Sequence, residues 1–375
     1  MVRHCRVTES GGWARPSGRP FVRRALPVAC AGLCAALLAW PARATDWVVG
    51  RTPEVFHPEA DEVATRVGGW VDLSYEDNDL ETSTRSINVN HLNFFVDTRY
   101  RDTWQLFLEG EFENESNLTG FEDEREYEVE QVYLRYRLRE GTEARVGKFN
   151  TPFGFWTPLH WTILMDTIRA PIHEDQRITP EQQYGVSLTG RLALPRGTAD
   201  LRYSAYMGYG NDSELLEESG SDGYAAGGDV RLELDEDSFV GVSYYQQQRE
   251  QENDRSERSM ALYGQLPISR TLLLRGEYIR QTRDANARPS FERKVNIIYA
   301  KLRWQLAERM YLNYRFNWGD NDDDVQTSTR YAHTLTYGYD LTSKIRMKVE
   351  YADHRFRDST RRDFRYWGLS FGAFF

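Results

Sequence analysis

The sequence contains few cysteines, and none after its first 34 residues. Among 375 residues there are three, Cys5, Cys30 and Cys34, and all of them precede a candidate signal-peptide cleavage site after Ala44. A mature chain without cysteine cannot contain a disulfide, a thiolate metal site or a cysteine nucleophile. Neither Cys30 nor Cys34 follows a convincing lipobox, so we do not expect a lipoprotein anchor.

A long hydrophobic run is also missing. The apolar stretch Ala25 to Trp40 is shorter than the roughly 20 residues that a transmembrane helix needs. It follows two arginines and precedes Ala42-Arg43-Ala44, which is the order of a basic region, an apolar region and a small-residue cleavage site. We therefore predict a signal peptide over residues 1–44 and a periplasmic leader over residues 45–64.

Positive charge is scarce in the predicted mature chain. Removal of residues 1–44 leaves 40 basic and 56 acidic residues, a formal charge of −16. This acidity excludes nucleic acid as an expected partner. The mean hydropathy of −0.67 is typical of soluble proteins, but a wide membrane barrel with a wet interior and polar loops has a similar average.

Alternation of apolar and polar residues recurs along the rest of the chain. The last nine residues show it most clearly, because Trp367, Leu369, Phe371 and Phe375 alternate with small or polar residues. Such a strand at a chain end would expose unpaired backbone groups to lipid, so we expect it to close a barrel against the first strand. This ending resembles the C-terminal signature of Gram-negative outer-membrane proteins, which places the chain in the outer membrane.

The alternating segments predict an all-β fold, a transmembrane antiparallel β-barrel of about sixteen strands over residues 65–375. The expected strands are 65–76, 88–100, 103–114, 125–138, 143–152, 183–194, 199–210, 224–234, 238–249, 258–268, 271–283, 293–306, 310–319, 329–341, 345–356 and 363–375. Short turns alternate with long polar connections, which indicates turns at the periplasmic end and loops outside. Aromatic residues near both ends indicate two interfacial girdles, and a soluble β-sandwich is disfavoured because one charged face would leave its core poorly filled.

The two faces of the predicted strands are strongly constrained. Leu92, Phe94 and Val96 alternate with Asn93 and Asp97. A shift by one residue would push charged side chains into lipid, at a cost of about 2–4 kcal/mol for an arginine near the midplane. The alternation changes phase at residues 128–132, where we expect a bulge.

A barrel of this size encloses an aqueous channel. The inward positions carry thirteen basic and eight acidic residues, so we expect a pore for small hydrophilic solutes with a modest preference for anions. Cross-strand ion pairs could instead neutralise the lining. The basic residues expected to line the pore are Arg135, Arg137, Arg202, Arg231, Arg275, Lys301, Arg303, Arg315, Arg346 and Lys348.

The longest connection, Phe155 to Gln182, is the candidate constriction. Its tryptophans, isoleucines and prolines make it too apolar and too stiff for a freely solvated loop. We expect it to fold into the lumen, and an outer cap or a subunit contact is the alternative. Its charged residues, expected in the eyelet, are Asp166, Arg169, Glu174, Asp175 and Arg177.

The run Arg145-Val146-Gly147-Lys148-Phe149-Asn150-Thr151-Pro152-Phe153-Gly154 precedes this loop. It resembles the corresponding segment of porins related to the phosphate-selective porin O and P group. The resemblance implies a homotrimer of sixteen-stranded barrels in the outer membrane, which passes anions or small organic solutes. Lipid and lipopolysaccharide are the expected surroundings.

Signals for catalysis or a bound cofactor are weak. The histidines are scattered without metal-ligand spacing, and Asp320, Asp322 and Asp324 lack the glycine and glutamate of a calcium loop. We predict neither enzymatic activity nor a cofactor. The alternative function is a non-conducting barrel that anchors or sheathes a partner protein.

Overall fold

The computed structural model describes residues 63–79, 84–117, 123–159, 161–171, 179, 181–195, 199–211, 223–235, 237–249, 255–285, 292–323, 326–357 and 362–375. The predicted signal peptide and most of the predicted leader lie outside these residues. In the described part, no helical segment has the length and apolar character that crossing a bilayer requires.

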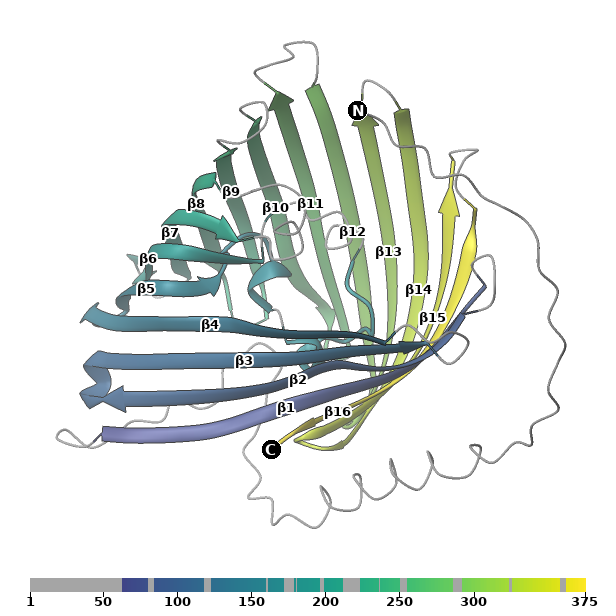
Figure 1. Ribbon diagram of the computed structural model, residues 1–375, viewed down its shortest axis with the longest axis horizontal. Helices are drawn as coiled ribbons and strands as arrows, with labels where there is room; N and C mark the ends of the chain where they lie inside the picture. Colours follow the sequence, from purple (N-terminus) through teal and green to yellow (C-terminus); the bar gives the residue numbers. More distant parts are fainter. Residues whose placement is uncertain are drawn as a thin grey trace, which may run out of the picture. The chain divides into compact units, whose positions relative to one another are not determined.

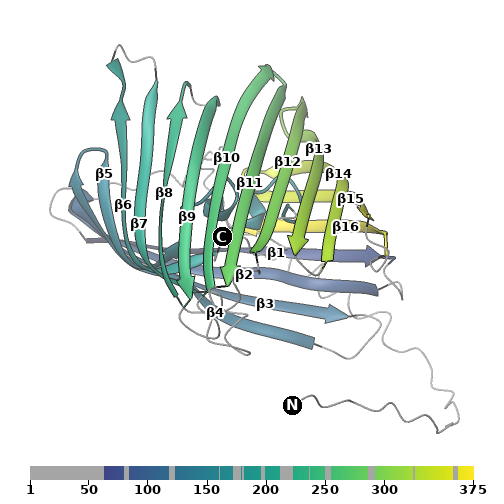
Figure 2. The same cartoon turned by 90° about the horizontal axis from the view of Figure 1, so that it is seen from above.

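Sixteen antiparallel strands form one closed barrel, as the sequence predicts (Figures 1 and 2). Each strand pairs with the next along the chain, and β1 pairs with β16. The strands are β1 Val63–Asn78, β2 Thr84–Tyr100, β3 Trp104–Asn117, β4 Asp123–Arg139, β5 Thr142–Asn150, β6 Gln182–Ala193, β7 Asp200–Asn211, β8 Gly223–Glu233, β9 Phe239–Arg249, β10 Arg255–Ser269, β11 Leu272–Ala285, β12 Glu292–Ala307, β13 Met310–Asp323, β14 Gln326–Thr342, β15 Ile345–Phe356 and β16 Phe364–Phe374.

The last residues of the chain close the barrel. Trp70 of β1 is paired with Phe374 of β16, and Gly69 and Phe375 exchange two backbone hydrogen bonds of 3.1 and 3.0 Å. The backbone groups of the final strand are thereby satisfied inside the sheet, as a strand in lipid requires. The predicted pairing of the first and last strands is confirmed.

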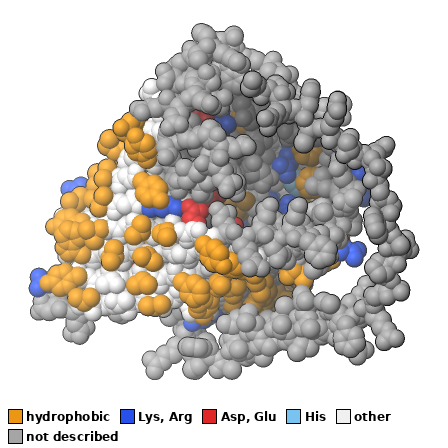
Figure 3. All heavy atoms as spheres, viewed as in Figure 1, with side chains coloured by type: hydrophobic (Ala, Val, Ile, Leu, Met, Phe, Trp, Pro, Cys, Tyr) orange, Lys and Arg blue, Asp and Glu red, His pale blue; other side chains and the backbone are white. Residues whose placement is uncertain are grey.

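The outer surface is apolar. Exposed leucine, valine and aromatic side chains recur at every second position of the strands, for example Leu106, Leu108, Leu262 and Leu335. Figure 3 shows them spread over the outer face of the strands. Outward girdle pairs such as Trp104 with Tyr136, whose ring centroids lie 4.5 Å apart, fit the predicted aromatic belt near the short turns.

The expected bulge in β4 is present. Glu109 of β3 pairs with Gln131, but Glu111, two residues later, pairs with Glu128, so the register shifts between them. The shift keeps polar residues of both strands inside the barrel despite the change of phase in the sequence.

Large aromatic side chains on the inner face lie over glycines of neighbouring strands. Tyr311 of β13 covers Gly338 of β14, where an added Cβ would come within 1.9 Å of the ring. Tyr263 of β10 and Gly241 of β9 form an equivalent pair, with 2.3 Å between a Cβ and the ring. These rings pack flat against the wall, because glycine leaves the room for them.

Candidate functional site

The connection between β5 and β6 runs through the interior of the barrel (Figure 1). After β5 the chain crosses to the wall formed by β9 and β11. There the amide of Gly154 donates to Ser243 of β9 at 2.9 Å, and the amide of Phe155 donates to Glu277 of β11 at 3.1 Å. Two short 3₁₀ turns follow, η3 Thr157–Leu159 and η4 Thr162–Leu164. We call residues 154–171 the lumen loop.

Asp166 is the charged anchor of the lumen loop. Its carboxylate accepts hydrogen bonds from Lys301 Nζ at 2.7 Å and from Arg303 Nη1 at 2.8 Å, both on β12. The carboxylate is 1% exposed and the lysine 2%. Burial by itself would raise the pKa of Asp166, but the two cations hold it well below its usual range. The carboxylate therefore stays ionised inside the barrel.

The backbone of the next residues is bound by β13 and β15. Arg315 donates to the carbonyl of Arg169 at 2.9 Å and to that of Ala170 at 3.1 Å, and Lys348 donates to the carbonyl of Thr167 at 3.0 Å. The amides of Ile168 and Arg169 donate to Glu350 at 2.8 and 3.2 Å. The polar groups that this irregular segment buries are thus paired with charged groups of the wall.

Apolar contacts fix the middle of the loop. Trp161 stacks on Phe95 of β2, with 6.1 Å between ring centroids and 16° between the planes, and lies 6.4 Å from Trp70 of β1. Ile163 is buried at Gly372 of β16, where a Cβ would meet its side chain at 2.7 Å. The apolar composition that predicts an inward fold therefore corresponds to contacts with the inner wall.

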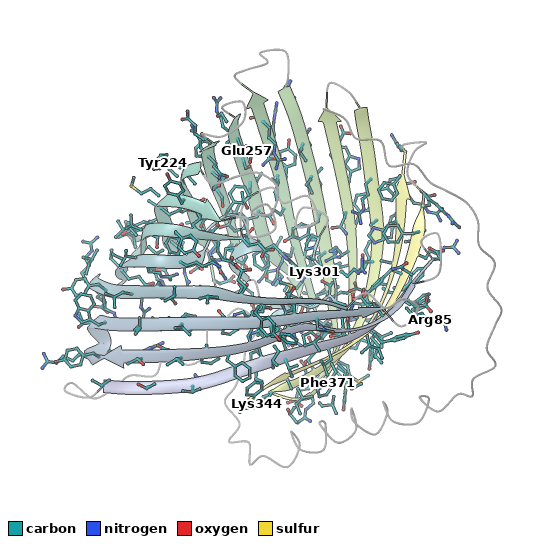
Figure 4. All side chains as sticks on the ribbon, in the orientation of Figure 1. Arg85, Tyr224, Glu257, Lys301, Lys344 and Phe371 are labelled. Atoms are coloured by element: carbon teal, nitrogen blue, oxygen red, sulfur yellow. The ribbon has the colours of Figure 1, made fainter. Side chains whose placement is uncertain are left out.

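Six of the ten cations predicted to line the pore face the lumen loop. Lys301, Arg303, Arg315 and Lys348 bind it directly as described, and Arg346 donates to the carbonyl of Ile163 at 3.4 Å. Arg275 lies 4.0 Å above the ring of Phe155. In Figure 4, Lys301 lies inside the barrel and Tyr224 on its outer edge. Because the loop covers these cations, they interact with groups of the protein and are shielded from a solute in the lumen.

Among the predicted eyelet residues, Asp166 is placed differently from the expectation. Asp166 does not project into open water. Its carboxylate is buried against β12, where it forms ion pairs with Lys301 and Arg303. Arg169 is exposed at the surface of the loop and forms an ion pair with Glu76 of β1. Glu174, Asp175 and Arg177 lie outside the described residues.

The other four predicted cations, Arg135, Arg137, Arg202 and Arg231, lie on β4, β7 and β8. Arg202 is directly paired in register with Arg231 on one side and with Arg191 of β6 on the other. We call Arg191, Arg202 and Arg231 the arginine row. Arg191 and Arg202 are 54% and 49% exposed, so their guanidinium groups meet the water of the lumen.

Each arginine of the row forms an ion pair with a nearby carboxylate. Asp200 pairs with Arg191, and Glu233 pairs with Arg202 at 2.8 Å and with Arg231 at 2.7 Å. On the next strands, Arg135 and Arg145 are also opposite each other and share Glu143. Arg145 was not predicted to line the pore, because the alternation is weak next to it.

No protein-family model matches the sequence, and neither does any curated protein. Among solved structures, an anion-selective porin from Comamonas acidovorans is similar with a TM-score of 0.61, 10% identity, and coverage of 84% of this chain and 100% of the porin. The outer-membrane protein OmpT of Vibrio cholerae has a TM-score of 0.59, 13% identity, and coverage of 86% and 100%.

A third similar structure is the outer-membrane channel DcaP of Acinetobacter baumannii, with a TM-score of 0.52, 11% identity, and coverage of 85% and 99%. At these identities the likeness concerns the fold. The chain has the sixteen-stranded architecture of Gram-negative outer-membrane barrels, and its apolar outer face places it in the outer membrane. The narrower resemblance to the phosphate-selective porins stays a prediction.

Proposed function

We propose that the protein is an outer-membrane channel through which small hydrophilic solutes diffuse, with a modest preference for anions. The proposal rests on the strand number, because a closed barrel of sixteen strands is too wide for the side chains of its wall alone to fill. The lumen loop contacts β9, β11–β13, β15, β16, β1 and β2. The passage we propose runs along the arginine row of β6–β8, where guanidinium groups are exposed.

The arginine row carries the proposal of anion preference. Like charges directly opposite each other in a sheet destabilise it. Here arginines of three adjacent strands lie side by side, and each also forms an ion pair with a carboxylate. Half-exposed guanidinium groups in a confined channel raise the local concentration of anions. The repulsion between the arginines lowers the stability of the barrel, and attraction of anionic solutes is the function that we propose for the row.

The similar structures support the proposal at the level of class. One of them is named as an anion-selective porin and another as an outer-membrane channel. One form of OmpT is described as a trimer, and we extend a homotrimeric assembly to this chain as part of the proposal. Cross-linking of the detergent-solubilised protein tests it, with a ladder ending at three chains as the expected result.

Planar-bilayer recordings across a salt gradient test the function. The wild type should show discrete conductance steps and a reversal potential whose sign indicates a preference for anions. The triple variant Arg191→Gln, Arg202→Gln, Arg231→Gln should move that potential toward zero or into the cationic range. The matched control removes the same charge from the outer face, where Arg258, Arg280 and Arg365 are exposed, and should leave selectivity unchanged.

The outcomes separate the two functions considered. A cation preference of the wild type, or a triple variant with unaltered selectivity, contradicts the role of the arginine row. A correctly folded barrel that produces no conductance steps contradicts the channel itself and favours an anchor or sheath for a partner protein.

A further inference from the structure

Three potential metal ligands meet on the inner face of the β2–β3 hairpin, away from the arginine row. They are His91 of β2 and Glu111 and Glu113 of β3, and their ligand atoms all lie within 4.8 Å of one another. His91 Nδ1 is 2.8 Å from Glu113 Oε1 and closer still to Glu111 Oε1. Imidazole nitrogen and carboxylate oxygen together are ligands for zinc and related divalent transition metals.

The register of the β2–β3 hairpin places the three side chains together, next to a bulge in β2. Leu92 pairs with Phe112, but the next pair is Val89 with Asn114, so two residues of β2 stand opposite the single residue Glu113. His91 is one of these two residues. On the β1 side His91 is paired with Asp72 and Asn90 is the extra residue, and bulges of this kind are frequent next to functional sites.

The surroundings hold the imidazole and one carboxylate in place while leaving the third ligand accessible. His91 packs against the indole of Trp70, with 5.2 Å between ring centroids. The Glu111 side chain is 3% exposed, whereas that of Glu113 is 43% exposed. Buried, positioned ligands are the prerequisite of a specific metal site, and an exposed one gives the ion a way in.

A cavity of about 350 Å³ borders the cluster. Its walls include His91 and Glu113, together with Glu76 and with Arg169 and Met165 of the lumen loop. An ion held by the three ligands would have a free coordination position on this side, open to water or to a solute. Sites with three protein ligands and one open position are the exchangeable kind of zinc site.

We propose that His91, Glu111 and Glu113 form a binding site for a divalent transition-metal ion in the channel interior. Neighbouring ligands of a tetrahedral zinc ion lie roughly 3.4 Å apart, so small rotations of the two carboxylates accommodate the ion. Calcium and magnesium are not the expected occupants, because they prefer oxygen ligands throughout. The proposal is independent of the ion selectivity proposed above.

Isothermal titration calorimetry with Zn²⁺ tests the site. The full barrel is stripped with EDTA, freed of chelator in detergent and titrated with the metal alone. The wild type should bind one ion per chain. Since loss of an outer-shell partner alone weakens metal sites about 10- to 100-fold, His91→Gln and Glu113→Gln should each weaken binding at least tenfold.

His354→Gln is the matched control. His354 is also a buried histidine of the inner face, but its Nδ1 lies 2.8 Å from Arg330 rather than beside carboxylates. Its replacement should leave zinc binding unchanged. Heat-modifiable migration in gels shows that each variant is folded, and Glu113→Gln, at a half-exposed position, keeps the test valid if His91→Gln does not fold.

Cobalt gives a second readout. Co²⁺ bound to nitrogen and oxygen ligands should produce a visible absorption band in the wild type and the control that is lost in His91→Gln. The proposal is overturned if the wild type takes up no zinc, which would leave the cluster as an imidazolium ion between two carboxylates. It is also overturned if all variants bind zinc equally.

Discussion

Lys301 Nζ donates a hydrogen bond of 2.7 Å to Asp166 Oδ2, across a sequence separation of 135 residues. The pair joins the lumen loop to the barrel wall, and both side chains are buried. A buried charge that loses its partner is destabilising by about 3–5 kcal/mol, whereas the complete pair adds little net stability. The need to keep these charges paired is therefore one of the forces that hold the loop in place, beside its backbone hydrogen bonds and apolar contacts.

We expect Asp166→Asn to loosen the lumen loop. The variant leaves Lys301 and Arg303 without their carboxylate, so open-channel current noise in bilayers should increase. Adding Lys301→Met to Asp166→Asn should reduce that noise, because it removes one uncompensated charge. Asp200→Asn, at the exposed Arg191 ion pair, is the control and should leave the noise at the wild-type level.

Deletion of residues 160–176 should raise the single-channel conductance, because these residues include most of the loop that crosses the lumen. It should also increase anion preference, since Lys301, Arg315 and Lys348 would then face water. Conductance and reversal potential are measured on the same channels. Unchanged conductance would argue against the inward placement of the loop.

The anchoring of the loop should withstand acid. A carboxyl group whose folded-state pKa is lowered contributes stability above its unfolded-state pKa, and loses it only as the pH falls through the folded-state value. For Asp166 that value lies well below the usual range. We therefore expect no increase in loop-dependent current noise between pH 7 and pH 4. A sharp rise near pH 4 would show that Asp166 titrates normally.

The Tyr311 and Gly338 pair provides a packing test. An added Cβ at Gly338 would lie 1.9 Å from Tyr311 Cζ, and Tyr311 in turn lies 4.4 Å below the guanidinium of Arg303. Gly338→Ala should cost about 1–3 kcal/mol through overpacking, seen as a lower temperature of barrel unfolding in gels. Gly110→Ala, whose Cβ would have its nearest contact at 3.8 Å, should have a smaller effect.

Removal of Phe375 should slow barrel closure. The residue contributes two backbone hydrogen bonds to Gly69 and packs its ring 5.6 Å from Phe94. Folding into lipid vesicles, followed by gel mobility, should show a slower rate and a lower final yield. A matched Phe375→Leu variant retains the backbone bonds and should fold closer to the wild type.

The properties of the fold that the sequence predicts depend on local patterns of apolar and polar residues. The number of strands and the faces of each strand follow from the alternation, because an arginine turned toward lipid is costly. The closure by the last strand follows because an open sheet edge is not tolerated in lipid. The bulge in β4 is visible as a change of phase at Glu128. These properties depend on residues that are close in sequence or on neighbouring strands.

Partners from distant segments were not predictable in this way. Alternation predicts only that Lys301 faces inward, whereas its carboxylate partner comes from a loop far away in the chain. Periodicity gives the direction of a side chain and does not identify which irregular segment will meet it. The His91 cluster is an intermediate case, since the turn after Tyr100 places His91 opposite Glu113 if the hairpin register is followed.

The arginine row and the loop-binding cations lie on opposite sides of the barrel, on β6–β8 and β12–β15 (Figure 2). One side presents guanidinium groups to water, and on the other the positive charge is already engaged by Asp166 and by backbone carbonyls. In the proposed passage, the electric field would therefore have a component across it. Zwitterions and other dipolar molecules would travel with their negative end turned toward β6–β8, so the channel would orient its cargo as well as admit it.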